Sequence, residues 1–172
     1  MDTLSKLGLK YGTDKIGKHH YLPLYHEMFK GRRKSIKKVL EIGAGEGLGL
    51  RMFRDYFPNA TIYGAEIQDN RIFKEDRIEV IKCNQTNYED LKSLIDKVGS
   101  DIDIVIDDGS HKPEDQVFTC ETVMRMINFG AIYIIEDVAD ATIVDKLDKF
   151  YPALIKVGER YDDQIIVMRI DE

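Results

Sequence analysis

The sequence predicts an α/β fold, in which a mostly parallel β-sheet is covered by helices. Apolar runs of strand length alternate along the chain with amphipathic stretches, and this alternation is typical of a parallel sheet with helical crossovers. The chain has 172 residues, of which 43% are hydrophobic. This is enough to bury one substantial core, and nothing in the length requires a second. We therefore expect residues 1–172 to form a single domain.

The apolar runs predict a mixed sheet of about seven strands. Five runs are expected in its parallel part: Lys38–Ile42, Thr61–Ile67, Ile78–Lys82, Ile102–Ile106 and Ala131–Ile135. Two more, Ala153–Val157 and Gln164–Ile170, flank a polar stretch, as in an antiparallel hairpin at a sheet edge. The helices expected before and between the strands are Tyr21–Phe29, Leu48–Phe57, Tyr88–Val98 and Glu114–Ile127. Pro113 is placed to start the last of these helices.

Composition and charge limit the expected partners. The 25 Lys and Arg against 31 Asp and Glu give a net charge of −6, which disfavours binding to nucleic acid. The basic residues between Lys30 and Lys38 form either a solvated connection or a patch for an anionic substrate. Cys83 and Cys120 match neither a metal knuckle nor a redox pair and are expected to be reduced thiols. No apolar run suits a signal peptide or a membrane span, so we expect a cytoplasmic protein without a membrane partner.

A glycine-rich turn follows the first predicted strand. Glu41 and Ile42 end that strand, and glycines stand at positions 43, 45, 47 and 49. Such a turn lets a ligand approach the backbone beneath the N-terminus of the next helix. The dinucleotide fingerprint would need a glycine where Leu48 stands, so NAD is disfavoured. The alternative is a glycine-rich turn that binds no ligand.

Polar residues end the second and third predicted strands. Glu66 lies 23 residues after Gly43, where a carboxylate is able to accept both hydroxyls of a ribose, although an acid at a strand end is often only solvated. Asn84 and Gln85 follow the third strand and would lie beside an adenine, which amides recognise as donors and acceptors. A simple turn is the alternative for this stretch.

Carboxylates also end the fourth and fifth predicted strands. Asp107 and Asp108 follow one apolar run, and Glu136 and Asp137 follow the next. If these strands are neighbours, the carboxylates meet at one edge of the sheet, where burial without a cation is costly. Asp108, Glu136 and Asp137 suit Mg²⁺ or another hard divalent ion. The alternative is that these acids cap the following helices.

Together these segments resemble a known family, the metal-dependent sugar O-methyltransferases of macrolide and related glycoside biosynthesis, of the mycinamicin and macrocin type. The stretches that carry the resemblance are Lys10–Lys15, His19–Tyr21, Leu40–Gly47, Tyr56–Ala60, Ile106–His111 and Ile135–Asp137. They span roughly residues 9 to 140. The resemblance implies a Rossmann-like class I methyltransferase fold with S-adenosylmethionine as the methyl donor.

The resemblance also implies roles for individual residues. The metal ligands are Asp108, Glu136 and Asp137, and His111 is the general base that acts beside Asp108. A role for His111 as no more than a salt-bridge partner is the alternative. The N-terminal segment, residues 1–30, closes over cofactor and substrate. The residues expected to contact the cofactor are Tyr11, Thr13, Glu41, Gly43, Gly45, Glu66, Asn84, Gln85 and Asp107.

The sequence departs from the family pattern at two points and leaves the acceptor open. Glu66 stands where the family usually has Asp, and Cys83-Asn84-Gln85 stands where it has Gly-Asp-Gln. The acceptor expected is a sugar hydroxyl of a glycoside, a glycan or a nucleotide sugar. Its pocket is expected to be either more open than in larger relatives or completed by another copy of the chain. The alternatives are a catechol-type or other phenol O-methyltransferase, a catalytically inactive S-adenosylmethionine-binding module, and a nucleotide-sugar or NAD enzyme.

Overall fold

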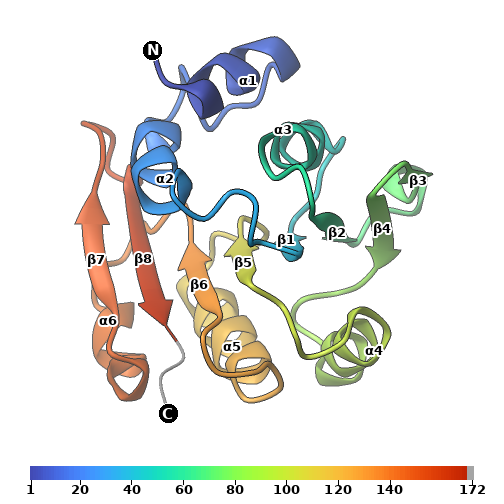
Figure 1. The fold of residues 1–172 in the computed structure, drawn as a ribbon. Coiled ribbons are helices and arrows are strands. Elements are labelled where there is room, and N and C mark those ends of the chain that lie inside the picture. Colours follow the sequence, from blue (N-terminus) through green and yellow to red (C-terminus); the bar gives the residue numbers. More distant parts are fainter. Residues whose placement is uncertain (170–172) are drawn as a thin grey trace.

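The computed structural model describes residues 1–169 and shows one eight-stranded sheet with helices on both faces (Figure 1). The strands are β1 (Lys38–Ile42), β2 (Thr61–Glu66), β3 (Lys74–Glu75), β4 (Ile78–Lys82), β5 (Ile104–Asp107), β6 (Ile132–Ile135), β7 (Ala153–Lys156) and β8 (Gln164–Arg169). The helices are α1 (Thr3–Tyr11), α2 (Tyr21–Phe29), α3 (Leu48–Tyr56), α4 (Tyr88–Val98), α5 (Pro113–Met124) and α6 (Ile143–Lys146). Two short 3₁₀ turns, η1 (Asp69–Arg71) and η2 (Asp148–Phe150), complete the elements.

The strand order β3-β4-β2-β1-β5-β6-β8-β7 confirms a mostly parallel sheet that ends in an antiparallel hairpin. Strands β4, β2, β1, β5 and β6 pair in parallel, whereas β8 runs antiparallel to both β6 and β7. The short strand β3, which pairs antiparallel with β4, was not expected and makes eight strands where seven were predicted. The last predicted residue of the hairpin, Ile170, lies outside the described residues.

Most predicted elements are confirmed, and the main differences lie at their ends. Strand β5 begins at Ile104, two residues later than predicted, and α5 ends at Met124 instead of Ile127. The N-terminal helix α1 was not predicted. It begins where the carboxylate of Asp2 accepts the backbone N–H of Ser5 at 2.8 Å, and it ends at Gly12, which has φ +72°.

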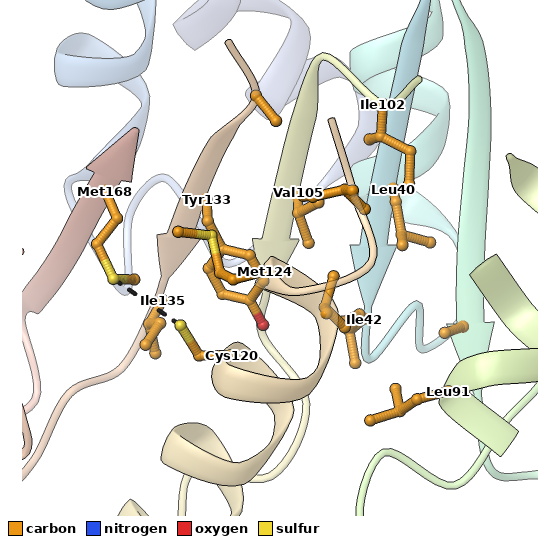
Figure 2. Close-up of a cluster of buried hydrophobic side chains, with 14 of the residues drawn as sticks. Leu40, Ile42, Leu91, Ile102, Val105, Cys120, Met124, Tyr133, Ile135 and Met168 are labelled. Carbon is orange, nitrogen blue, oxygen red and sulfur yellow. Dashed lines mark hydrogen bonds between the residues drawn. The ribbon is translucent and has the colours of Figure 1, made fainter. Parts of the chain in front are cut away.

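Two hydrophobic clusters fill the space on either side of the sheet. Helices α1, α2 and α3 pack over one face, and α4, α5 and α6 pack over the other. Side chains of β1 alternate between the two clusters, with Leu40 and Ile42 on one side and Val39 on the other. Figure 2 shows part of the α5 side, where the free thiol of Cys120 lies 3.8 Å from the sulfur of Met168. None of the helices in residues 1–169 combines the length and apolar character needed to cross a bilayer.

Candidate active site

The carboxyl ends of β1, β5 and β6 meet at one edge of the sheet and build the site. Ile42 of β1 is in register with Asp107 of β5, and Asp107 is in register with Ile135 of β6. The chain therefore leaves the three strands side by side, at Gly43, Asp108 and Glu136. This confirms the prediction that the fourth and fifth strands of the sequence analysis are neighbours and bring their carboxylates to one edge.

A cleft of about 640 Å³ opens above this edge, between the glycine-rich turn and the loops after β2, β4 and β5. It contains five of the residues predicted to contact a cofactor: Gly43, Gly45, Glu66, Asn84 and Gln85. Asp108 and Ser110 form its wall on the β5 side. Glycines, amides and one carboxylate therefore surround a space of the size of a small-molecule ligand.

Two glycines of the turn have different functions. A Cβ at Gly43 would lie 2.2 Å from the carbonyl oxygen of Asp108, so this glycine allows the β1 and β5 loops to pack together. A Cβ at Gly45 would meet no atom within 4 Å, and Gly45 has φ +53°. The backbone at Gly45 is therefore open to a ligand, which is the arrangement predicted for this turn.

Glu66 is held at the end of β2 by backbone donors. One carboxylate oxygen accepts the N–H of Gly45 at 2.9 Å, and the other accepts the N–H of Gln68 at 2.9 Å. Each oxygen keeps a second lone pair, and the residue lines the cleft. The structure thus links Glu66 directly to Gly45, the open glycine of the turn.

Three more residues at the strand ends, Asn84, Gln85 and Asp107, were predicted to contact the cofactor, and they differ in their access to the cleft. Asn84 lines the cleft, and its side-chain oxygen also accepts the backbone N–H of Thr86 at 3.1 Å, as in a turn. Gln85 accepts the N–H of Ser110 at 2.5 Å and donates to Asp107 at 3.2 Å. Asp107 is buried beneath the cleft and does not line it; burial raises the pKa of Asp107 to about 7. Gln85 and Asp107 therefore hold the β5 loop in place.

A second cleft of about 320 Å³ lies on the other side of the glycine-rich turn. The segment between α1 and α2 forms one wall, with Thr13 and Lys15, and Glu41 lines the opposite side. Glu41 is buried, and within residues 1–169 no group donates a hydrogen bond to its Oε2. Tyr11, which was also expected at the cofactor, lines neither cleft, because its hydroxyl donates to Asp55 on α3.

Lys15 is the residue that the sequence analysis missed. Its ammonium group is buried and lies 2.5 Å from Asp108, 2.6 Å from Glu136 and 3.1 Å from Glu41. Buried carboxylates require a positive charge nearby, and this requirement could have indicated a lysine. The sequence analysis assigned the positive charge to a metal ion alone. Burial by itself lowers the pKa of Lys15, yet the three carboxylates outweigh this effect and raise it well above its usual range.

Glu136 is buried, and both of its carboxylate oxygens have protein partners. One of its oxygens accepts the hydroxyl of Tyr25 at 2.6 Å, and the other pairs with Lys15. Burial raises the pKa of Glu136. Asp108 behaves differently, because Lys15 and His111 outweigh its burial and lower its pKa. Of the three predicted metal ligands, Asp108 and Asp137 lie close enough to His111 to share an ion with it, and Glu136 is not part of that group.

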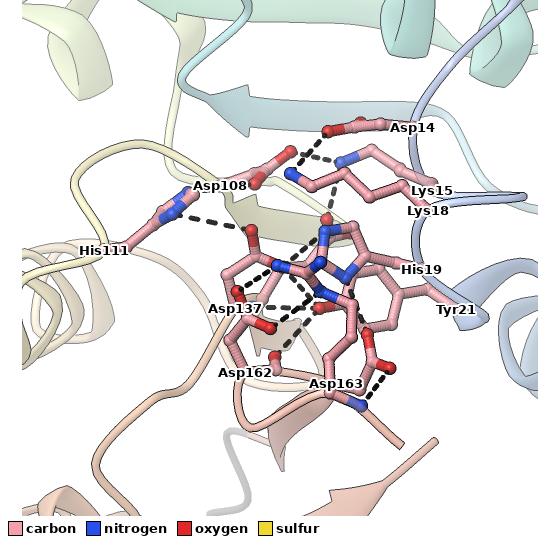
Figure 3. Close-up of polar contacts among 12 residues, drawn as sticks. Asp14, Lys15, Lys18, His19, Tyr21, Asp108, His111, Asp137, Asp162 and Asp163 are labelled. Atoms are coloured by element: carbon pink, nitrogen blue, oxygen red, sulfur yellow. Dashed lines mark hydrogen bonds and ion pairs between the residues drawn. The ribbon is translucent and has the colours of Figure 1, made fainter. Parts of the chain in front are cut away.

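Asp108, His111 and Asp137 form a cluster at the mouth of the site (Figure 3). One ligand atom from each lies within 4.8 Å of the others. The imidazole of His111 is 3.5 Å from Asp108 through Nε2 and 3.5 Å from Asp137 through Nδ1. The hydrogen bond with Asp108 raises the pKa of His111. Two carboxylates and an imidazole at this spacing fit a divalent cation.

The backbone conformation of Asp137 turns its carboxylate toward this cluster. Asp137 has φ +51°, which is uncommon for a residue other than glycine and is concentrated at functional sites. One carboxylate oxygen accepts the hydroxyl of Tyr21, and the other faces His111. The N-terminal segment and α2 thus supply Lys15, Tyr21 and Tyr25. These three side chains bind the carboxylates that end β5 and β6.

The comparisons with known proteins agree with this geometry. No protein-family model matches the sequence. The 8-demethyl-8-alpha-L-rhamnosyl tetracenomycin-C 2'-O-methyltransferase of Streptomyces olivaceus is 36% identical over 141 residues, which cover 78% of this chain and 37% of that protein. The mycinamicin VI 2''-O-methyltransferase of Micromonospora griseorubida is 36% identical over 142 residues, covering 78% of this chain and 35% of that protein.

A solved structure is similar over almost the whole chain. MycE methyltransferase from the mycinamycin biosynthetic pathway, in complex with Mg, SAH and mycinamycin VI, superposes with a TM-score of 0.80 at 27% identity. The match covers 98% of this chain and 53% of that one.

The sheet order, the glycine-rich turn and the acidic strand ends define a class I methyltransferase fold. The chain is a homologue of the sugar O-methyltransferases that act on tetracenomycin and macrolide glycosides. It spans just over a third of the length of these curated relatives.

Proposed function

We propose that this chain is the methyl-transferring domain of an S-adenosylmethionine-dependent O-methyltransferase that acts on a sugar hydroxyl with a divalent cation. The observation that carries the proposal is the position of Asp108. It lines the large cleft, lines the small cleft, and belongs to the cluster with His111 and Asp137. A hydroxyl held at the cluster therefore lies next to a ligand held by the glycine-rich turn.

The residues of the clefts fit S-adenosylmethionine. The open backbone at Gly45 and the adjacent Gly43 accommodate the sulfonium end, and Glu66 accepts the ribose hydroxyls. The unpaired, buried oxygen of Glu41 in the second cleft suits the ammonium group of the methionine part, with Thr13 opposite. Asn84 lines the large cleft and would contact the adenine.

The proposed chemistry divides between the cluster and the methyl donor. Asp108 and Asp137 would hold the cation, and His111 would lie beside them without binding the ion, so that its ring nitrogen is free to accept a proton. That Glu136 supplies a further ligand stays a prediction. When bound, the cation supplies positive charge that stabilises the developing alkoxide and favours a neutral imidazole. His111 accepts the proton of the acceptor hydroxyl, and the oxygen attacks the methyl group in line, while the bond from the methyl carbon to sulfur breaks and leaves its electron pair on S-adenosylhomocysteine.

The named relatives favour a sugar over a phenol as the acceptor. The tetracenomycin-C 2'-O-methyltransferase and the mycinamicin VI 2''-O-methyltransferase, both 36% identical to this chain, are sugar O-methyltransferases. We therefore propose a glycoside, a glycan or a nucleotide sugar as the acceptor. That another copy of the chain completes the acceptor pocket stays a prediction.

A screen for methyl transfer tests the proposal. The chain is incubated with methyl-labelled S-adenosylmethionine and a panel of glycosides, nucleotide sugars and catechols, with Mg²⁺ or with excess EDTA. We expect labelled product from at least one sugar only when Mg²⁺ is present. Label on a catechol but on no sugar would reject the sugar assignment, and failure to bind S-adenosylhomocysteine in calorimetry would reject the cofactor assignment.

A further inference from the structure

The buried ammonium group of Lys15 lies among the carboxylates of Glu41, Asp108 and Glu136 and supplies a positive charge there (Figure 3). A lysine ammonium has three N–H donors, and the three carboxylates around it come from three different parts of the sheet edge. Glu41 belongs to β1, Asp108 follows β5 and Glu136 follows β6. One side chain from an irregular segment therefore holds the ends of three strands together.

The contact of Lys15 with Asp108 also affects the cluster of Asp108, His111 and Asp137. Oδ2 of Asp108 lies 2.5 Å from the ammonium of Lys15, whereas Oδ1 lies 3.5 Å from Nε2 of His111. The carboxylate is thus shared, with one oxygen turned inward and the other turned toward His111 and the cleft. Rotation of Asp108 would break the inner contact, so Lys15 sets the direction of the outer oxygen.

Resting on the function proposed above, we infer that Lys15 is a positioning residue that fixes Oδ1 of Asp108 toward the divalent cation and the acceptor hydroxyl. Lys15 touches neither reacting group in this arrangement and acts through Asp108. The competing explanation is that Lys15 only neutralises buried negative charge and so keeps the fold intact. The two explanations predict different cation affinities for a variant that lacks Lys15 and in which a second substitution removes one negative charge.

A paired variant separates positioning from neutralisation. Glu41→Gln is the reference, and Lys15→Met/Glu41→Gln removes one positive and one negative charge compared with the wild type. Binding of Mn²⁺ is measured by electron paramagnetic resonance of the free ion. Because groups that orient a ligand are typically worth about 10- to 100-fold in metal affinity or activity, we expect the double variant to bind Mn²⁺ more weakly than the reference by that order.

The affinity for S-adenosylhomocysteine, measured by calorimetry, should be the same in the reference and the double variant, since both lack the Glu41 carboxylate, and this equality shows that loss of Lys15 leaves the cofactor cleft intact. Lys10→Met, which removes an exposed lysine at the end of α1, is the matched control and should leave Mn²⁺ affinity unchanged. Equal Mn²⁺ affinity in the reference and the double variant would overturn the positioning role. If the wild-type chain binds neither Mn²⁺ nor S-adenosylhomocysteine, the proposed function fails instead.

A measurement on the wild-type protein needs no substitution. The ¹⁵N–¹H signal of the Lys15 ammonium should persist because its protons are held by three buried carboxylates and exchange slowly. Titration with Mg²⁺ should shift this signal, since Lys15 and the cation share Asp108. The exposed Lys10 should show no such shift. A Lys15 signal that does not respond to a saturating Mg²⁺ concentration would contradict the inference.

Discussion

Nδ1 of His19 lies 2.8 Å from Oδ1 of Asp163, and 144 positions of sequence separate the two residues. Both side chains are only 2% exposed. The ring of His19 also stacks on Tyr21, whose hydroxyl donates to Asp137. This pair therefore connects the N-terminal segment, the loop between β7 and β8, and the acidic cluster.

Removal of this connection should lower stability. Asp163→Ala removes the acceptor for both His19 and the backbone N–H of Arg160. Since a buried group left without its partner typically costs about 1–3 kcal/mol, we expect the free energy of unfolding to fall by that amount in urea titrations. Asp145→Ala, at an exposed position of α6, is the control. Equal stability of the two variants would show that the pair contributes nothing.

Substitution of the open glycine should abolish cofactor binding. A valine at Gly45 places a branched side chain where the structure leaves empty space, and it also strains a backbone with φ +53°. Gly130→Val provides the matched control, because Gly130 has φ +87° and no neighbour within 4 Å of its Cβ position but lines neither cleft. In calorimetry, only the Gly45 variant should lose the heat of S-adenosylhomocysteine binding. Unchanged affinity after Gly45→Val would refute the assignment.

The sheet was predictable because its inner strands carry a strong local signal. Strand β1 has apolar residues on both of its faces, as expected for a strand covered on both sides, and its bounds match the prediction. Helix α1 has only a short signal. Leu4, Leu7 and Tyr11 lie on one face and pack against the same cluster, but Gly8 on that face lowers the helix propensity. Gly8 is required because a Cβ there would lie 2.3 Å from Leu22.

The site was predictable only as far as strand ends determine it. The convergence of Asp108 and Glu136 follows from the parallel order of β5 and β6. The direction of each carboxylate does not, since it depends on Lys15 and Tyr25, which reach the site through tertiary contacts of an irregular segment and of α2. Sequence spacing contains no information on these contacts. The contact of His111 with Asp137 likewise depends on how the loop after β5 folds, so the sequence predicted His111 beside Asp108 but not between the two carboxylates.

Removal of divalent cations should stop turnover and spare cofactor binding. Chelation takes positive charge from the cluster of Asp108, His111 and Asp137, whereas Gly45 and Glu66 do not depend on it. After dialysis against EDTA we expect no methyl transfer, unchanged affinity for S-adenosylhomocysteine, and recovery on addition of Mg²⁺. Full activity in excess EDTA would contradict the need for a divalent cation. Lys15 and His111 alone would then neutralise the carboxylates.

Replacement of His111 should slow the chemical step itself. The imidazole is held between Asp108 and Asp137, and its side chain is 46% exposed, so it is accessible to a hydroxyl at the mouth of the site. General-base catalysis typically supplies about 10²- to 10⁴-fold, and His111→Ala should lose single-turnover rate by that order. Binding of S-adenosylhomocysteine should survive, because His111 lines the second cleft but the contacts proposed for the cofactor come from Gly45, Glu66 and Glu41.

The two histidines of the N-terminal segment complete this test. His20 is exposed, so His20→Ala should affect acceptor binding at most, whereas His19→Ala should lower stability through loss of the contact with Asp163. Single-turnover rates with every site saturated separate a catalytic base from a residue that only binds or stabilises, since only loss of the base slows the chemical step under these conditions. A normal rate in His111→Ala together with a collapse in a folded His19 or His20 variant would transfer the role of base to that residue.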